Sequence, residues 1–117
     1  MRKLELTAEG VTVWLTIRHA TVSDAMQRGM LAAKAAETDY PSDVEQAVAV
    51  MIYPRCIACA QGEIEQNGER KSIEHLTPLE FCALPYEIGE AWLEAVLEEN
   101  PGWSLQPLEE QDNEKKD

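Results

Sequence analysis

The chain has 117 residues, 44% of them hydrophobic, and a formal net charge of −12. This length and composition allow one folded domain with a modest core and exclude a chain that is disordered throughout. The charge argues against direct binding of nucleic acid or of an anionic membrane, because both need clustered Lys and Arg. No apolar stretch approaches the roughly 20 residues of a membrane-spanning helix, and three cysteines without a disulfide-type spacing indicate a reducing cytoplasm.

The N-terminal segment alternates apolar and polar residues, first at Leu4 and Leu6 and then from Val11 to Ile17. Period-two alternation with β-branched residues predicts two strands, and residues 7–10 supply the turn of a β-hairpin. Trp14 falls on the face opposite the valines, so it needs cover from another element or from a partner.

Two helices are expected next, and each begins at a predicted capping box, at Thr21 and at Ser42. The first helix carries a stripe of small and flexible side chains at helical spacing: Val22, Ala25, Met26, Gly29, Met30 and Ala33. Such a stripe suits either a core face or an adaptable partner surface. We expect the second to be one long helix that is kinked at Pro54 and stops at Gly62.

The segment 63–74 is polar and has Asn67-Gly68 at its centre, a pair that favours a type I′ hairpin turn. A short solvated hairpin and a mobile loop are both compatible with this composition. Thr77-Pro78 then predicts a third capping box and a short helix that stops before Pro85.

The last predicted helix runs from Pro85 to about Glu99 and carries a row of acidic side chains at helical spacing: Glu87, Glu90, Glu94 and Glu98. The row is either a solvated face or a recognition surface for a basic partner. Trp103 follows the end of this helix and is expected to be half exposed, as tryptophans at binding hot spots are.

Together these patterns predict an α+β fold, mainly α, with an N-terminal β-hairpin followed by about four helices and a possible second small hairpin near 63–74. We expect one globular domain over residues 1–104. Residues 105–117 have the acidic composition of a disordered tail.

Cys56 and Cys59 form a C-x-x-C pair, which can be half of a zinc site or a redox pair. Zinc would need two more ligands, and His75 and Cys82, the ones within reach, do not form a second close pair. The pair also lies at the end of a predicted helix, where no dipole lowers a thiol pKa. We therefore interpret the cysteines as structural, with a zinc or redox protein as an alternative, and expect no metal and no cofactor.

Nucleophilic catalysis is also not indicated, because neither His19 nor His75 is flanked by a nucleophile in a recognisable elbow. The glycines are scattered and form no phosphate-binding loop. We therefore expect a protein that is not an enzyme.

Two parts of the chain carry a family resemblance. They are Gly10-Val11-Thr12-Val13-Trp14-Leu15 with Arg18-His19-Ala20-Thr21-Val22-Ser23-Asp24, and Leu76-Thr77-Pro78-Leu79-Glu80-Phe81 with Leu84-Pro85 and Asn100-Pro101-Gly102-Trp103. Over roughly residues 4–103 the chain resembles the small tail assembly chaperones of long-tailed phages and prophages. The resemblance implies a mostly helical protein of the host cytoplasm that binds the tape measure protein and helps to recruit tail tube subunits.

The leading hypothesis is therefore non-catalytic protein binding, in which self-association of the chain stays open. The candidate partner-binding residues are Trp14, Met26, Met30, Glu87, Glu90, Glu94, Glu98 and Trp103. An alternative is an acidic inhibitor that mimics nucleic acid and occupies a basic site, or another small protein-binding regulator.

Overall fold

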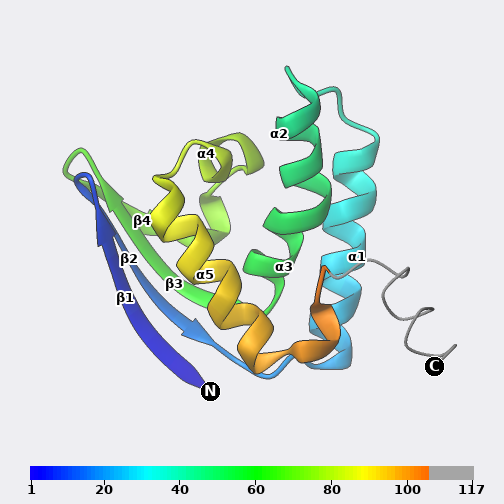
Figure 1. Ribbon diagram of the computed structural model, residues 1–117, viewed down its shortest axis with the longest axis horizontal. Helices are drawn as coiled ribbons and strands as arrows, with labels where there is room; N and C mark the ends of the chain where they lie inside the picture. The colour runs from blue at the N-terminus through cyan, green and yellow to red at the C-terminus, as the bar shows by residue number, and fades with distance from the viewer. Residues whose placement is uncertain (106–117) are drawn as a thin grey trace, which may run out of the picture.

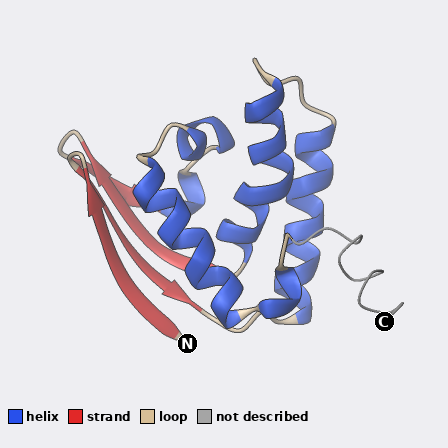
Figure 2. Cartoon of the chain, in the orientation of Figure 1, coloured by secondary structure: helices blue, strands red, loops and turns tan. Residues whose placement is uncertain are grey.

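The computed structural model describes residues 1–105, which form an antiparallel sheet with helices on one side of it (Figure 1). The strands lie in the order β1 (Arg2–Ala8), β2 (Val11–Ile17), β3 (Ala60–Gln66) and β4 (Glu69–Ser72). The helical segments are α1 (Val22–Ala36), α2 (Asp43–Ala47), η1 (Val48–Ile52), α3 (Tyr53–Ala58), η2 (Ile73–His75), α4 (Pro78–Cys82), α5 (Tyr86–Glu99) and η3 (Pro101–Trp103). The predicted α+β class is confirmed (Figure 2), whereas the tail predicted for residues 105–117 lies, apart from Leu105, outside the described residues.

The predicted N-terminal hairpin is present, and of the two alternatives for segment 63–74 the structure shows the hairpin. Each hairpin turns on two residues with left-handed backbone. Glu9 and Gly10 (φ 48° and 81°) join β1 to β2, and Asn67 and Gly68 (φ 52° and 79°) join β3 to β4. Two consecutive residues with positive φ match the right-handed twist of the flanking strands. Because β3 also pairs with β2, the second hairpin is an integral half of the sheet.

Gly62 does not end a helix, as the sequence predicted, but lies inside β3. A Cβ atom at this position would come within 1.8 Å of the carbonyl oxygen of Trp14 on the neighbouring strand. The glycine therefore permits close approach of β2 and β3, and the helix before it ends at Ala58 instead.

Two of the three capping boxes are complete. The hydroxyl of Thr21 accepts a hydrogen bond from the backbone N–H of Asp24, and the Asp24 carboxylate accepts one from the backbone N–H of Thr21. Thr77 and Glu80 form the same pair at α4. At α2 the Ser42 hydroxyl oxygen accepts a hydrogen bond from the backbone N–H of Glu45. The Glu45 carboxylate, however, accepts a hydrogen bond from the Ser42 hydroxyl and not from the backbone N–H of Ser42. The box there is half formed.

The segments α2, η1 and α3 follow one another without a break, as expected for one long helix. The backbone stays right-handed helical at Val48 and at Tyr53. The irregularity predicted at Pro54 takes the form of the π-helical segment η1 directly before it. The π-helical turn of η1 is wider than an α-helical turn, and this width accommodates Pro54. Proline has no N–H to donate, and its ring needs room beside the preceding turn.

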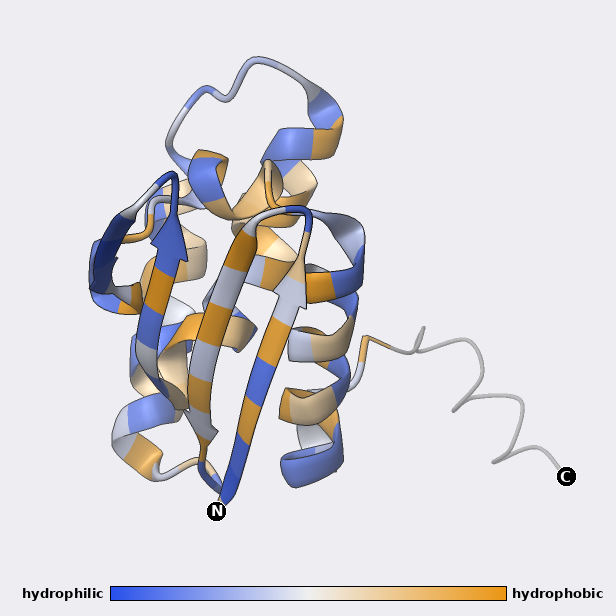
Figure 3. Cartoon of the chain, turned by 90° about the vertical axis from the view of Figure 1, so that its left-hand side faces the viewer, coloured by the Kyte–Doolittle hydropathy of each residue, from blue (hydrophilic) through white to orange (hydrophobic). Residues whose placement is uncertain are grey.

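The core lies between the inner face of the sheet and the helices. Residues nearer the core and residues nearer solvent alternate along β1, β2 and β3, so one face of the sheet is turned to the core and the other outward (Figure 3). Trp92 of α5 is fully buried, donates its indole N–H to the carbonyl oxygen of Cys56 at 3.0 Å and meets the ring of Phe81 edge-on at 5.3 Å. These contacts fix α5 between the sheet and α3.

Candidate partner-binding surfaces

The structure distributes the candidate residues over four places. Trp14 lies on the outer face of the sheet, the two methionines on α1, the four glutamates on α5 and Trp103 on η3. The methionines lie one turn apart on their helix, and the glutamates likewise form one group. The eight residues therefore do not make a single interface.

Trp14 is covered by the chain itself. The guanidinium of Arg70 on β4 lies 4.1 Å from the centre of its ring, and Arg70 also donates from Nε to a carboxylate oxygen of Glu63 at 2.9 Å. A cation over an indole at an exposed site contributes about 0.5–1 kcal/mol. The expected cover for Trp14 is thus supplied from within the sheet, which makes this residue the weakest of the partner-binding candidates.

The inner side of α1 is held by an ion pair. Arg18 donates from Nε and Nη2 to the two carboxylate oxygens of Asp24, at 3.0 and 2.8 Å, and from Nη2 to the carbonyl oxygen of Ala58 at 3.2 Å. Asp24 is only 7% exposed. The hydrogen bonds from Arg18 lower the pKa of Asp24 against the opposing effect of burial. This pair ties α1 both to the end of β2 and to α3.

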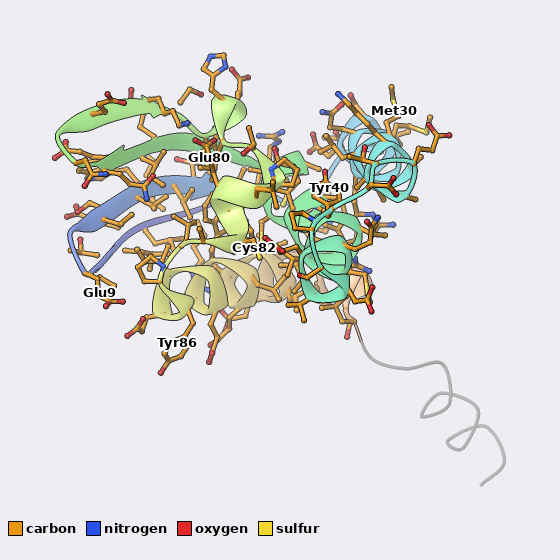
Figure 4. The ribbon with its side chains drawn as sticks, turned by 90° about the horizontal axis from the view of Figure 1, so that it is seen from above. Glu9, Met30, Tyr40, Glu80, Cys82 and Tyr86 are labelled. Atoms are coloured by element: carbon orange, nitrogen blue, oxygen red, sulfur yellow. The ribbon has the colours of Figure 1, made fainter. Side chains whose placement is uncertain are left out.

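The outward side of α1 carries the whole predicted apolar stripe, and all of its members are exposed: Val22, Ala25, Met26, Gly29, Met30 and Ala33. The side chains of Met26 and Met30 are 63% and 64% exposed. Met30 points away from the body of the protein (Figure 4). Of the two interpretations that the sequence allowed, the structure excludes a core face.

Gly29 lies in the middle of α1, where a Cβ atom would meet nothing within 4 Å. Glycine inside a helix costs about 0.5–1 kcal/mol relative to alanine. No packing among residues 1–105 explains this cost. Together with Ala25 and Ala33 on neighbouring turns, Gly29 forms a strip of exposed residues with small side chains or none.

The four glutamates of α5 are all exposed, as predicted for either of their two roles. Glu98 forms an ion pair with Arg2 of β1. The sequence of α5 contains no Lys or Arg, so every charged side chain that α5 itself contributes is acidic.

Trp103 is half buried, as expected. The guanidinium of Arg28 on α1 lies 4.8 Å from the centre of its ring, and Arg55 donates from Nε to its carbonyl oxygen at 2.7 Å. The residue therefore supports the base of α1, and its exposed edge borders that helix.

The C-x-x-C pair is part of the core, since Cys56 and Cys59 are both fully buried. Burial raises the pKa of both thiols, that of Cys59 to about 11, which disfavours the thiolate needed for metal binding or redox attack. Within residues 1–105 no group of three or more His, Cys, Asp or Glu side chains is gathered where it could hold a metal ion.

Asn100 has a structural role that its position after the last predicted helix does not indicate. The side chain is buried, accepts from the backbone N–H of Ala20 at 2.7 Å and donates to the carbonyl oxygen of Arg18 at 3.1 Å. It therefore connects the end of α5 to the segment before α1. The signal in the sequence is weak, because an asparagine after a helix is common without such contacts.

No family model, curated protein or solved structure matches this chain. Among residues 1–105, no helix is both long and apolar enough to cross a membrane.

Proposed function

We propose that the protein is a non-catalytic binding module whose main docking surface is the outward side of α1. The observation that carries this proposal is the exposure of every residue of the α1 apolar stripe, with two methionines more than 60% exposed. Contiguous exposed apolar side chains on a folded domain typically mark a site of interaction with another protein.

The composition of the stripe suits an amphipathic helix as its partner. Methionine side chains adapt to irregular apolar surfaces, and small residues at intervals of four let a helix backbone come close. The inner side of α1 is fixed by the pair between Arg18 and Asp24, so the stripe is presented on a helix that is already in place. A surface formed before binding loses less conformational entropy when the partner docks.

The specific role that we propose is that of a tail assembly chaperone of a long-tailed phage or prophage, acting in the host cytoplasm. The support for it is the resemblance of residues 4–103 to that family together with the α1 surface. A tape measure protein is a long amphipathic helix that self-associates when it is left bare. The α1 stripe would cover part of it, the net charge of −12 would keep the complex in solution, and tail tube subunits would join this complex.

Co-expression with the tape measure protein from the same genome tests the proposal. We expect the chain to increase the soluble yield of the tape measure protein and to co-purify with it. The double variant Met26→Asp/Met30→Asp should lose both effects, because it places two charges on the apolar stripe. The matched control Val44→Asp/Leu79→Asp makes the same charge change at exposed apolar residues on α2 and α4 and should behave like the unchanged protein.

Unchanged co-purification of the Met26→Asp/Met30→Asp variant would contradict the assignment of the surface. No increase in soluble yield with the unchanged chain would contradict the chaperone role.

A further inference from the structure

A second apolar surface lies along α5, on the side that faces η1 and α4. Val48 and Ile52 of η1 and Cys82 of α4 line one end of this groove together with Gly89 and Leu93 of α5. Leu93 also lines its continuation along α5, with Leu97 and a border of Glu90, Glu94 and Glu98. Glu90 and Leu93 line both parts, so the two parts are continuous. We call this open surface depression the α5 groove.

Gly89, like Gly29, is a glycine inside a helix at a position where the surrounding residues leave room for a side chain. It lies inside α5, and a Cβ atom there would meet nothing within 4 Å. The absence of a side chain keeps the α5 groove open beside Cys82 and Leu93, at the cost of about 0.5–1 kcal/mol of helix stability. No contact among residues 1–105 requires a glycine here.

The border of the α5 groove determines the charge of its occupant. Glu90 and Glu94 are exposed beside the apolar floor, and α5 has no basic side chain to offset them. A basic group brought to this border gains attraction, whereas an acidic group is repelled. The apolar floor distinguishes the site from a surface that only mimics the phosphates of nucleic acid, which would present carboxylates without a groove of leucines.

We propose that the α5 groove binds a basic amphipathic helix of a partner protein. Its apolar side lies over Gly89, Leu93 and Leu97, and its Lys and Arg side chains lie over Glu90 and Glu94. The α5 residues that line this part of the groove run from Gly89 to Glu98. At about 1.5 Å per residue they extend over about 14 Å, so the groove accommodates about two to three turns of such a helix.

This site is separate from the α1 surface and goes beyond the proposed function. Seen from above, Tyr86 at the start of α5 and Met30 on α1 point to opposite sides of the molecule (Figure 4). The two surfaces can therefore be occupied at the same time, one by an apolar partner helix and the other by a basic one.

Cys82 provides a reporter for the α5 groove. Of the three cysteines, Cys56 and Cys59 are buried, whereas Cys82 is partly exposed and lines the groove. Alkylation by iodoacetamide, followed by mass spectrometry, therefore measures access to this site. The probe is a synthetic 14-residue amphipathic helix of Leu and Lys, compared with a peptide that has Glu in place of every Lys.

We expect the Leu/Lys peptide to slow the alkylation of Cys82 about tenfold when its free concentration is about ten times its Kd, since only the unoccupied fraction reacts. The Leu/Glu peptide should leave the rate unchanged. Added salt should weaken the protection, because the ionic contacts are exposed to solvent.

Variants locate the bound peptide, with affinity measured by fluorescence anisotropy of a labelled peptide. Glu90→Lys/Glu94→Lys should weaken binding about tenfold, because two attractive contacts become repulsive. The matched control Glu5→Lys/Glu65→Lys makes the same charge change on the sheet and should bind like the unchanged protein. Gly89→Phe should also weaken binding while the protein stays folded, since the new side chain enters open space.

Several results would overturn the proposal. Equal protection of Cys82 by the Leu/Glu peptide would remove the charge preference, and equal protection by oligolysine would show recognition by the carboxylates alone. Unchanged affinity of the Glu90→Lys/Glu94→Lys or Gly89→Phe variant would place the peptide elsewhere.

Light scattering tests whether a second copy of the chain is the occupant. If the unchanged chain forms a dimer and the Gly89→Phe variant is a monomer, a second copy occupies the groove. Loss of peptide binding in Met26→Asp/Met30→Asp alone would assign the peptide to α1, leaving the proposed function intact.

Discussion

The two sides of α1 differ in a way that is unusual for a helix on a small domain. The inner side is fixed by the charged pair between Arg18 and Asp24, with Ala35 buried further along the helix. The largest apolar side chains of the outward side, Met26 and Met30, are left exposed. A helix held mainly by burial would place its methionines inward. The contacts that position α1 thus lie on its inner side, and the apolar stripe of the outward side makes no comparable contact within residues 1–105.

The largest expected effect follows from removing the ion pair on the inner side. Asp24→Ala deprives Arg18 of two charge-assisted hydrogen bonds and opens the capping box of α1. We expect the free energy of unfolding to fall by about 2–3 kcal/mol, measured by urea denaturation. The matched control Ser23→Ala, at the adjacent exposed position, should change it by less than about 0.5 kcal/mol. A similar effect of both variants would mean that the pair does not hold the helix.

The same pair makes stability depend on pH in a defined direction. The pKa of Asp24 is lower in the folded protein than in the unfolded chain, chiefly because of the hydrogen bonds from Arg18. Its contribution to stability is therefore complete above about pH 4, the range of an unperturbed Asp, and is lost as pH falls through the lowered value. Asp24→Asn lacks this contribution at every pH.

Urea unfolding between neutral and acidic pH checks this expectation. Glu80, whose pKa is also lowered by its hydrogen bond from the backbone N–H of Thr77, loses its contribution in both proteins. The difference between the two pH profiles therefore isolates Asp24. It should shrink as pH falls below about 4, and parallel profiles would argue against a lowered pKa.

A smaller effect with the opposite sign is expected on the outward side. Gly29→Ala should raise the free energy of unfolding by about 0.5–1 kcal/mol, because alanine favours the helix and its Cβ atom meets nothing. The larger Gly29→Leu should also leave the fold intact but obstruct the strip beside Met26 and Met30. Calorimetry and co-purification with the tape measure protein separate the two effects. A loss of stability in Gly29→Ala would show that the glycine serves the fold.

The local elements could be predicted from the sequence because their signals act over a few residues. Thr21 and Thr77 begin helices through contacts with the residue three positions later, and Asn67-Gly68 forms a turn by its own backbone preference. The orientation of α1 could not be predicted in this way. Its sequence is apolar on more than one side, and the side turned inward is the one whose Asp24 meets Arg18 while Leu31 and Ala35 pack against the body of the protein.

The remaining differences also arise from contacts between distant segments. Gly62 reads as a helix stop in isolation, and only the approach of Trp14 from β2 explains it as a strand residue. The α5 groove exists because η1 and α4 are brought to one side of α5. Its glutamates were identified in the sequence, and Leu93 belongs to the apolar residues of the same predicted helix, but Gly89 carried no signal of its own.

The most direct test of the α1 surface is a methyl NMR spectrum of the protein labelled at the methionine methyl groups. The chain has four methionines, and Met1 and Met51 lie outside α1. On addition of a tape measure segment, the account predicts that the signals of Met26 and Met30 shift or broaden while those of Met1 and Met51 stay in place. A complex that forms with the Met26 and Met30 signals unchanged would contradict the claim that the outward side of α1 is the docking surface.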